Sequence, residues 1–202
     1  MTGKHTLPRL SPDRRALGYF SGALVAAILA IGVLLYLFPG IRPLSIDPSN
    51  PNVSLDDVER EVRRRYPVAD ITVGALAGMM TAGTVTLFDV RTLEEFEAGH
   101  LPGAIRIEPG ASTEDILREH RDKIGAHPIV FYCAVGVRSS RVLMRTLQDL
   151  APLTEGRLYN LRGGVFRWAA ERRALVKGDQ PGAPHPYDEN WGKLLSRTIP
   201  RS

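Results

Sequence analysis

Short apolar runs alternate with amphipathic segments from about residue 70 onward, and this alternation is the strongest constraint on the fold. The runs are TVTLFD at 84–89, AIRI at 104–107, PIVFY at 128–132 and RLYNL at 157–161. Their apolar, β-branched and aromatic residues are typical of buried strands. ITVGALAGMM at 71–80 predicts a short strand or turn that enters a helix. Strands that alternate with helices predict an α/β domain whose parallel sheet is covered on both faces.

The segments between these runs carry the signals of helix starts. Ser54 and Thr92 are each followed three residues later by an acid, and STEDILREH begins at residue 112. Serine and threonine accept hydrogen bonds from the first backbone N–H groups of a helix, and acids in the first turn complement its dipole. Helices are therefore predicted over residues 54–65, from 92, over 112–120, over 138–150 and over 165–173, the last after a tight turn at Gly163-Gly164.

Residues 16–38 form a continuous apolar segment, and no Asp, Glu, Lys or Arg occurs between Arg15 and Arg42. A helix of this length rises about 34 Å at roughly 1.5 Å per residue, which is enough to cross a bilayer core of about 30 Å. A cleavable signal peptide is the alternative, but its apolar region is usually shorter. We therefore predict a single transmembrane helix. Because basic residues cluster before it, the N-terminus is predicted to be cytoplasmic and the rest of the chain extracytoplasmic.

Small residues repeat at a spacing of four within this segment. They are Gly18, Gly22, Ala26 and Ala30. Such a stripe allows close approach of a second transmembrane helix, although Gly and Ala are also common in membrane helices for no such reason. The lipid bilayer is therefore a predicted partner of this segment. Pairing with a second transmembrane helix through the stripe of small residues is a hypothesis.

The chain divides into five parts by composition. They are a basic N-terminal segment (1–15), the transmembrane helix (16–38), a Pro-rich linker (39–53), an α/β domain (54–176) and a Pro- and Gly-rich tail (177–202). The tail carries Tyr187 and Trp191, which we expect to pack back onto the domain; covering a pocket or binding a partner is the alternative.

Charge and cysteine content exclude several classes of function. Residues 1–15 hold four basic residues and one acid, a net charge of +3, which leaves only +1 for the rest of the chain. The domain is therefore not expected to bind nucleic acid. A single cysteine permits no intramolecular disulfide and no cysteine-rich metal site, and we predict no metal and no cofactor.

Cys133 is the candidate reactive residue, because it directly follows the strand PIVFY and precedes a helix. Ligands of open parallel sheets bind beyond the carboxyl ends of the strands. Backbone N–H groups around Gly136, the start of the following helix and the charge of Arg138 are all expected to lower the pKa of the thiol. The alternative is an inert buried cysteine, which is common.

Several motifs occur in the order found in one family. They are Asp89-Val-Arg91, Glu95-Phe96, Gly99-His100-Leu-Pro-Gly-Ala104, the loop Cys-x-x-Gly-x-Arg at 133–138, and Gly163-Gly164. Over residues 70–175 the chain resembles a single-domain rhodanese, a sulfurtransferase. The resemblance implies a sandwich in which helices flank a five-stranded parallel sheet. It also implies a cysteine that accepts a sulfane sulfur, becomes a persulfide and passes the sulfur to a thiol or cyanide.

The resemblance assigns roles to individual residues. Cys133 corresponds to the sulfur carrier, and Asp89 and Arg91 correspond to a supporting pair at the end of the sheet. His100 belongs to a turn that is more often a signature of the fold than a catalytic element. The loop expected to bind the persulfide or an incoming anion consists of Ala134, Val135, Gly136, Val137 and Arg138.

The length and composition of this loop favour sulfur transfer over related chemistry. Four residues separate Cys133 from Arg138, whereas the related dual-specificity phosphatases have a loop one residue longer, which gives room for phosphate. Ala134 stands where many thiosulfate-using members carry a polar or charged residue. We therefore predict a membrane-anchored sulfurtransferase that works through a Cys133 persulfide, with thiosulfate or a persulfide as donor and a thiol as acceptor. A non-enzymatic binding or redox-sensing module is the alternative.

Overall fold

The computed structural model describes residues 24–30, 44–125 and 127–199, and the chain divides into two compact units, 1–42 and 43–202. In the first unit, residues 24–30 are helical. Within the described ranges, no helix has both the length and the apolar character that a membrane crossing requires. A transmembrane helix was predicted over 16–38, and most of that segment lies outside the described residues. The same holds for Gly18 and Gly22 of the small-residue stripe.

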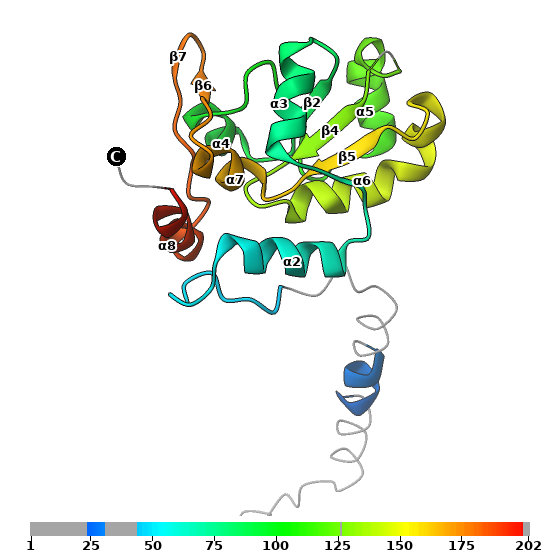
Figure 1. Cartoon of the computed structure of the whole chain (residues 1–202). Helices are drawn as coiled ribbons and strands as arrows, with labels where there is room; N and C mark the ends of the chain where they lie inside the picture. Colours follow the sequence, from blue (N-terminus) through cyan, green and yellow to red (C-terminus); the bar gives the residue numbers. More distant parts are fainter. Residues whose placement is uncertain (1–23, 31–43, 126, 200–202) are drawn as a thin grey trace, which may run out of the picture. The chain divides into compact units, whose positions relative to one another are not determined.

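The second unit alternates strands and helices as the sequence predicts (Figure 1). Its strands are β1 (Asp70–Ile71), β2 (Thr86–Asp89), β3 (Ile105–Arg106), β4 (Ile129–Tyr132), β5 (Leu158–Leu161), β6 (Val176–Lys177) and β7 (Gln180–Pro181). Its α-helices are α2 (Leu55–Arg65), α3 (Val73–Thr81), α4 (Leu93–Ala98), α5 (Thr113–His120), α6 (Val137–Leu150), α7 (Gly164–Ala170) and α8 (Glu189–Thr198). Two short 3-10 turns, η2 (Arg121–Lys123) and η3 (Ala151–Leu153), follow α5 and α6.

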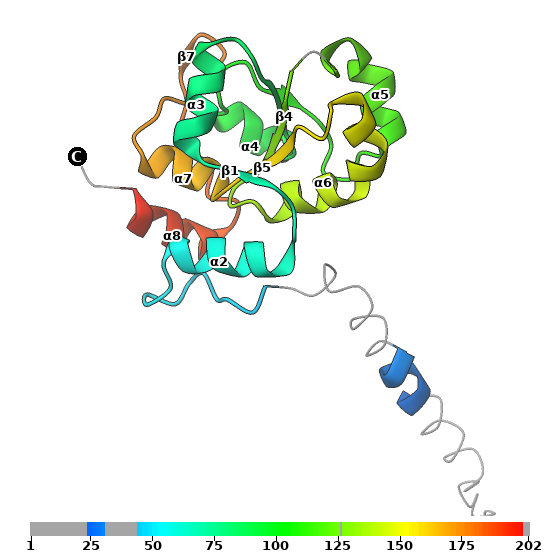
Figure 2. The same cartoon turned by 45° about the vertical axis from the view of Figure 1, so that its right-hand side comes forward.

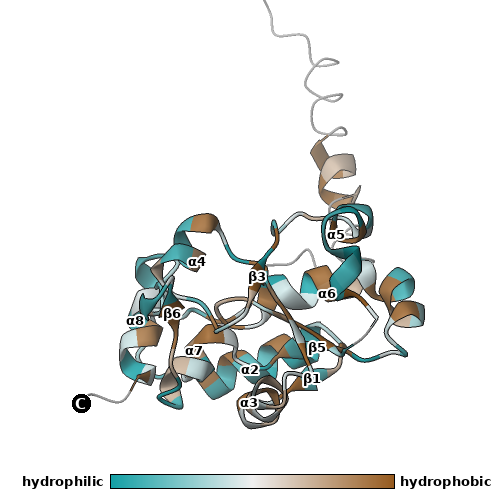
Figure 3. Ribbon diagram, turned by 90° about the horizontal axis from the view of Figure 1, so that it is seen from above, coloured by the Kyte–Doolittle hydropathy of each residue, from teal (hydrophilic) through white to brown (hydrophobic). Residues whose placement is uncertain are grey.

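The first five strands form one parallel sheet in the order β1-β5-β4-β2-β3, which confirms the predicted five-stranded parallel sheet. The central strand β4 is buried on both faces, because its side chains alternate between two cores. Ile129 and Phe131 pack toward α5 and α6, whereas Val130 and Tyr132 pack toward α3 and α7. Helices therefore cover both faces of the sheet, as Figures 1 and 2 show, and Figure 3 shows mainly apolar strands between helices that carry both polar and apolar residues.

Side-chain caps define where the helices predicted from Ser54, Thr92 and Ser112 begin. Each of these hydroxyls accepts a hydrogen bond from a backbone N–H group in the first turn, and the acid at that position bonds back to the cap residue. These capping boxes satisfy donors that a helix start otherwise leaves without partners. The local signals in the sequence therefore locate these three helix starts correctly.

A third core cluster lies at one side of the domain and joins segments from both ends of the second unit. It packs α2 against α8, with Val58, Leu194 and Leu195 among its buried residues, and the two helices lie side by side in Figures 1 and 2. Part of the predicted linker joins this cluster: Leu44, Ile46 and Val53 pack against it. The linker predicted over 39–53 was thus too long, since apolar residues spaced between its prolines fix residues 44–53 on the domain.

Candidate active site around Cys133

Cys133 lies at the carboxyl end of β4, with its residue surface 1% exposed. It continues the alternation of the strand and points to the same face as Phe131, so its side chain meets the start of α6. The chain turns there through Gly136, whose φ of 99° is the left-handed conformation that glycine adopts most readily. Helix α6 begins at the next residue.

The start of α7 fixes the backbone of this loop by hydrogen bonds to its carbonyl oxygens. The N–H groups of Val165 and Phe166 donate to the carbonyl oxygens of Cys133 and Ala134 at 2.9 and 3.0 Å. Gly164 has a φ of 53°, and a Cβ atom there would overlap the Cys133 carbonyl oxygen. In a trans peptide the N–H group points opposite to the C=O group. The N–H groups of Ala134 and Val135 therefore face away from α7, and the Val135 N–H group donates to the Cys133 sulfur.

The sulfur atom of Cys133 is surrounded by groups that stabilise negative charge. The N–H group of Gly136 donates to Sγ at 3.2 Å. Burial alone raises the pKa of the thiol, but the charge of Arg138 and hydrogen bonds from Ser139 and Val135 lower it, and the net pKa lies below the usual value. A thiolate is the nucleophilic form of cysteine, so the site favours a reactive sulfur.

Glu95 holds Arg138 in place. Two guanidinium nitrogens of Arg138 donate to the two carboxylate oxygens of Glu95 at 2.6 and 2.7 Å. Burial raises the pKa of Glu95, but this pairing outweighs it and the net pKa is lowered. The same carboxylate accepts from the N–H group of Thr92 in the capping box of α4. We interpreted Glu95 from the sequence only as part of a motif and a helix start, so its role at the site was missed.

Asp89 and Arg91 form a second ion pair, but the pocket beside Cys133 is not lined by either residue. Arg91 donates to Asp89 at 2.6 Å, and both side chains are 1% exposed or less. The Arg91 guanidinium also donates to the carbonyl oxygen of Gly99 at 2.9 Å. The pair connects the end of β2 to the loop after α4, which is the position of a structural support.

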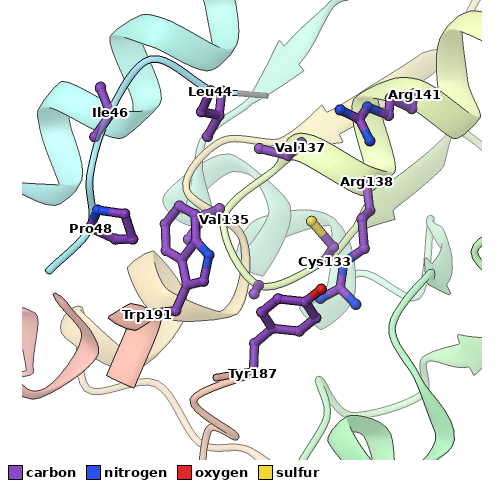
Figure 4. A pocket seen from close by; sticks show the side chains of 11 residues that line it. Leu44, Ile46, Pro48, Cys133, Val135, Val137, Arg138, Arg141, Tyr187 and Trp191 are labelled. Atoms are coloured by element: carbon purple, nitrogen blue, oxygen red, sulfur yellow. The ribbon is translucent and has the colours of Figure 1, made fainter. Parts of the chain in front are cut away.

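A pocket of about 380 Å³ opens beside the thiol (Figure 4). Residues Cys133, Ala134, Val135, Val137, Arg138 and Arg141 form one side, and Leu44, Ile46, Pro48, Tyr187 and Trp191 form the other. Leu44, Ile46 and Pro48 were missed as site residues, whereas Tyr187 and Trp191 were named from the sequence only in a tail for which covering a pocket was the alternative. The signal for them was weak: apolar and aromatic residues in the Pro-rich segments at both ends of the domain. The aromatic tail thus packs onto the domain and lines the pocket at the same time.

Comparisons with known proteins place this domain in a family. The model of the rhodanese-like domain matches residues 72–171. A human thiosulfate:glutathione sulfurtransferase is 30% identical over 79 residues, which cover 34% of this chain and 68% of that protein. The chain belongs to the rhodanese-like family.

Two further similar proteins match this chain over different shares of their length. An HTH-type transcriptional regulator of Mycobacterium tuberculosis is 48% identical over 67 residues, but the match spans 33% of this chain and only 28% of the regulator. The crystal structure of a rhodanese-related protein from Thermoplasma volcanium is 23% identical, with a TM-score of 0.43 over 54% of this chain and 98% of that one. The match with the regulator therefore concerns only part of each of the two proteins.

The pKa of Cys133 in this rhodanese-like domain predicts how its reactivity depends on pH. Iodoacetamide alkylates the thiolate, so the alkylation rate should rise with pH around a midpoint below that of free cysteine. Arg138→Met should move this midpoint upward, because it removes a positive charge and leaves the Glu95 carboxylate nearby. Alkylation rates measured across pH test this, with Arg145→Met on the same helix as control. Equal midpoints for both variants would contradict the assigned role of Arg138.

Proposed function

We propose that this protein is a sulfurtransferase that carries sulfane sulfur on Cys133. The observation that carries the proposal is the thiol itself: its pKa is lowered, it receives the Gly136 N–H group, and it lies at the base of a pocket. The Ala134 N–H group, which faces away from α7, supports the same chemistry, because it would provide a donor for a second sulfur beyond Sγ. Fixed donors aimed at developing charge stabilise such anionic groups.

The proposed reaction has two steps that need no oxidant or reductant. In the first, the Cys133 thiolate attacks the outer sulfur of a donor such as thiosulfate or a persulfide; the S–S bond of the donor breaks, and sulfite or a thiolate leaves. In the second, an acceptor thiolate attacks the outer sulfur of the Cys133 persulfide, and the Cys133 thiolate is restored. With one cysteine in the chain, the acceptor must be a separate molecule.

We also propose that residues 16–38 anchor the protein in a membrane. The N-terminus is then cytoplasmic, and the rhodanese-like domain lies on the extracytoplasmic side of the membrane. The support is the length of the uncharged segment and the basic cluster that precedes it. The full chain should stay with membranes through an alkaline carbonate wash. Recovery of the chain in the supernatant would remove the anchor from the proposal but leave the sulfur chemistry unaffected.

The test of sulfur transfer is whether Cys133 accepts sulfur. After incubation with thiosulfate or glutathione persulfide, the intact protein should gain the mass of one sulfur atom, and peptide mapping should locate it on Cys133. Addition of a thiol should remove it. A protein that gains no sulfur from these donors or from an uncharged organic hydropersulfide would contradict the proposal, and one that gains sulfur but never releases it would indicate a binding or redox-sensing module instead.

A further inference from the structure

The pocket beside Cys133 has an apolar wall that comes from both ends of the second unit. Leu44, Ile46 and Pro48 precede α2, and Trp191 belongs to α8 (Figure 4). The ring of Trp191 lies edge-on to buried Phe166, with ring centroids 6.5 Å apart, and thus faces the pocket from a fixed position. Residues 44–48 and helix α8 both lie outside residues 72–171, which match the family domain. The wall is therefore an addition to the domain.

The opposite side of the pocket is also mainly apolar, since Ala134, Val135 and Val137 line it. The cavity of about 380 Å³ is in the range of pockets that enclose small organic molecules. Thiosulfate is much smaller and would leave most of this volume unfilled. Its sulfonate oxygens would face apolar side chains, and an anion without partners is costly to bury.

The charges at the pocket also disfavour a dianion. Among the described residues that line it, Arg138 and Arg141 are the charged side chains besides the thiolate. Glu95 compensates the charge of Arg138 with two hydrogen bonds, and the Tyr187 ring covers that guanidinium with its centroid 4.8 Å away. Arg141 donates to the neutral hydroxyl of Tyr66 at 2.9 Å and so keeps its single charge.

We propose that the donor is an organic hydropersulfide, R–S–SH, whose carrier R is uncharged and apolar. This inference rests on the sulfur transfer proposed above and specifies its substrate. The carrier packs between the Leu44–Pro48 segment, Val135 and Trp191. The Cys133 thiolate attacks the outer sulfur, the S–S bond of the donor breaks, and the proton stays on the transferred sulfur. The carrier leaves as the thiolate R–S⁻, and Arg141 balances its single negative charge.

The test compares three donors on the full chain: benzyl hydropersulfide, glutathione hydropersulfide and thiosulfate. The rate of Cys133 persulfidation, followed by mass spectrometry at several donor concentrations, gives kcat/KM for each. Benzyl hydropersulfide should exceed both charged donors by at least about tenfold, a factor typical of one well-buried apolar group. This comparison uses the unmodified chain and so does not depend on the folding of a variant.

A pair of variants locates the preference in the pocket. Leu44→Asn puts an uncharged polar amide in the apolar wall and should lower kcat/KM for benzyl hydropersulfide by about 10- to 100-fold, a larger loss than for thiosulfate. Leu147→Asn, on the exposed side of α6 where Leu147 is 39% exposed, is the matched control and should change kcat/KM for neither donor. Equal or faster loading by a charged donor would overturn the apolar substrate while the sulfurtransferase stands. Loading by none of the three would overturn both.

Discussion

Replacing Cys133 with serine should lower turnover with every sulfane sulfur donor by at least about 1,000-fold, because a covalent carrier that cannot form its intermediate retains only substrate binding. A serine hydroxyl is almost fully protonated at neutral pH and forms no persulfide. The substitution changes one buried atom, and the N–H group of Gly136 that now reaches Sγ at 3.2 Å can donate to a hydroxyl oxygen instead. The loss should therefore be chemical, with the fold retained.

The measurement is steady-state turnover of donor and thiol acceptor, with thermal unfolding of each variant recorded in parallel. Ser140→Ala is a suitable control, since the Ser140 hydroxyl is buried near the start of α6 and has no hydrogen-bond partner in the described part of the chain. That variant should keep its activity. A Cys133→Ser protein with undiminished transfer would show that another group carries the sulfur.

Asp89→Ala should lower the free energy of unfolding by about 3–5 kcal/mol, which is the usual cost of removing one partner from a buried ion pair. Arg91 would then keep its charge in a position where its side chain is 1% exposed, with the Gly99 carbonyl oxygen as a remaining acceptor. Because the ion pair lies outside the pocket, the folded fraction of the Asp89→Ala variant should load Cys133 with sulfur at a nearly normal rate.

The double variant Asp89→Leu/Arg91→Met separates the loss of a charge partner from the loss of packing. Replacement of both ions by apolar side chains of similar volume should cost less than Asp89→Ala alone. Urea denaturation of the three proteins gives the comparison. A double variant that is destabilised more than the single one would mean that the ion pair contributes more stability than its apolar replacement, contrary to this prediction.

Local patterns in the sequence were sufficient to predict most of the domain. The runs at 84–89 and 128–132 predict strands because a strand buried on both faces needs apolar side chains on both. The helix starts at Ser54, Thr92 and Ser112 were predictable because a cap and its acid lie within one turn. The position of Cys133 between β4 and α6 follows from the same local signals.

The parts of the site that the sequence did not reveal depend on contacts between distant segments. Glu95 and Arg138 are 43 residues apart, and no local pattern relates them. Leu44, Tyr187 and Trp191 come to the pocket only because α2 and α8 pack together in the third core cluster. The Pro-rich composition of 39–53 suggested a linker, since its few apolar residues show no period. The membrane anchor over 16–38 stays a prediction.

Transfer from an isolated persulfide tests the central claim most directly. The full chain would be loaded with donor, freed of excess donor, mixed with a thiol acceptor and sampled over time by mass spectrometry. We predict that the extra sulfur on Cys133 disappears at a rate no slower than steady-state turnover, while an equal amount of acceptor persulfide forms. A Cys133 persulfide that stays unchanged while turnover continues would contradict its role as the sulfur carrier.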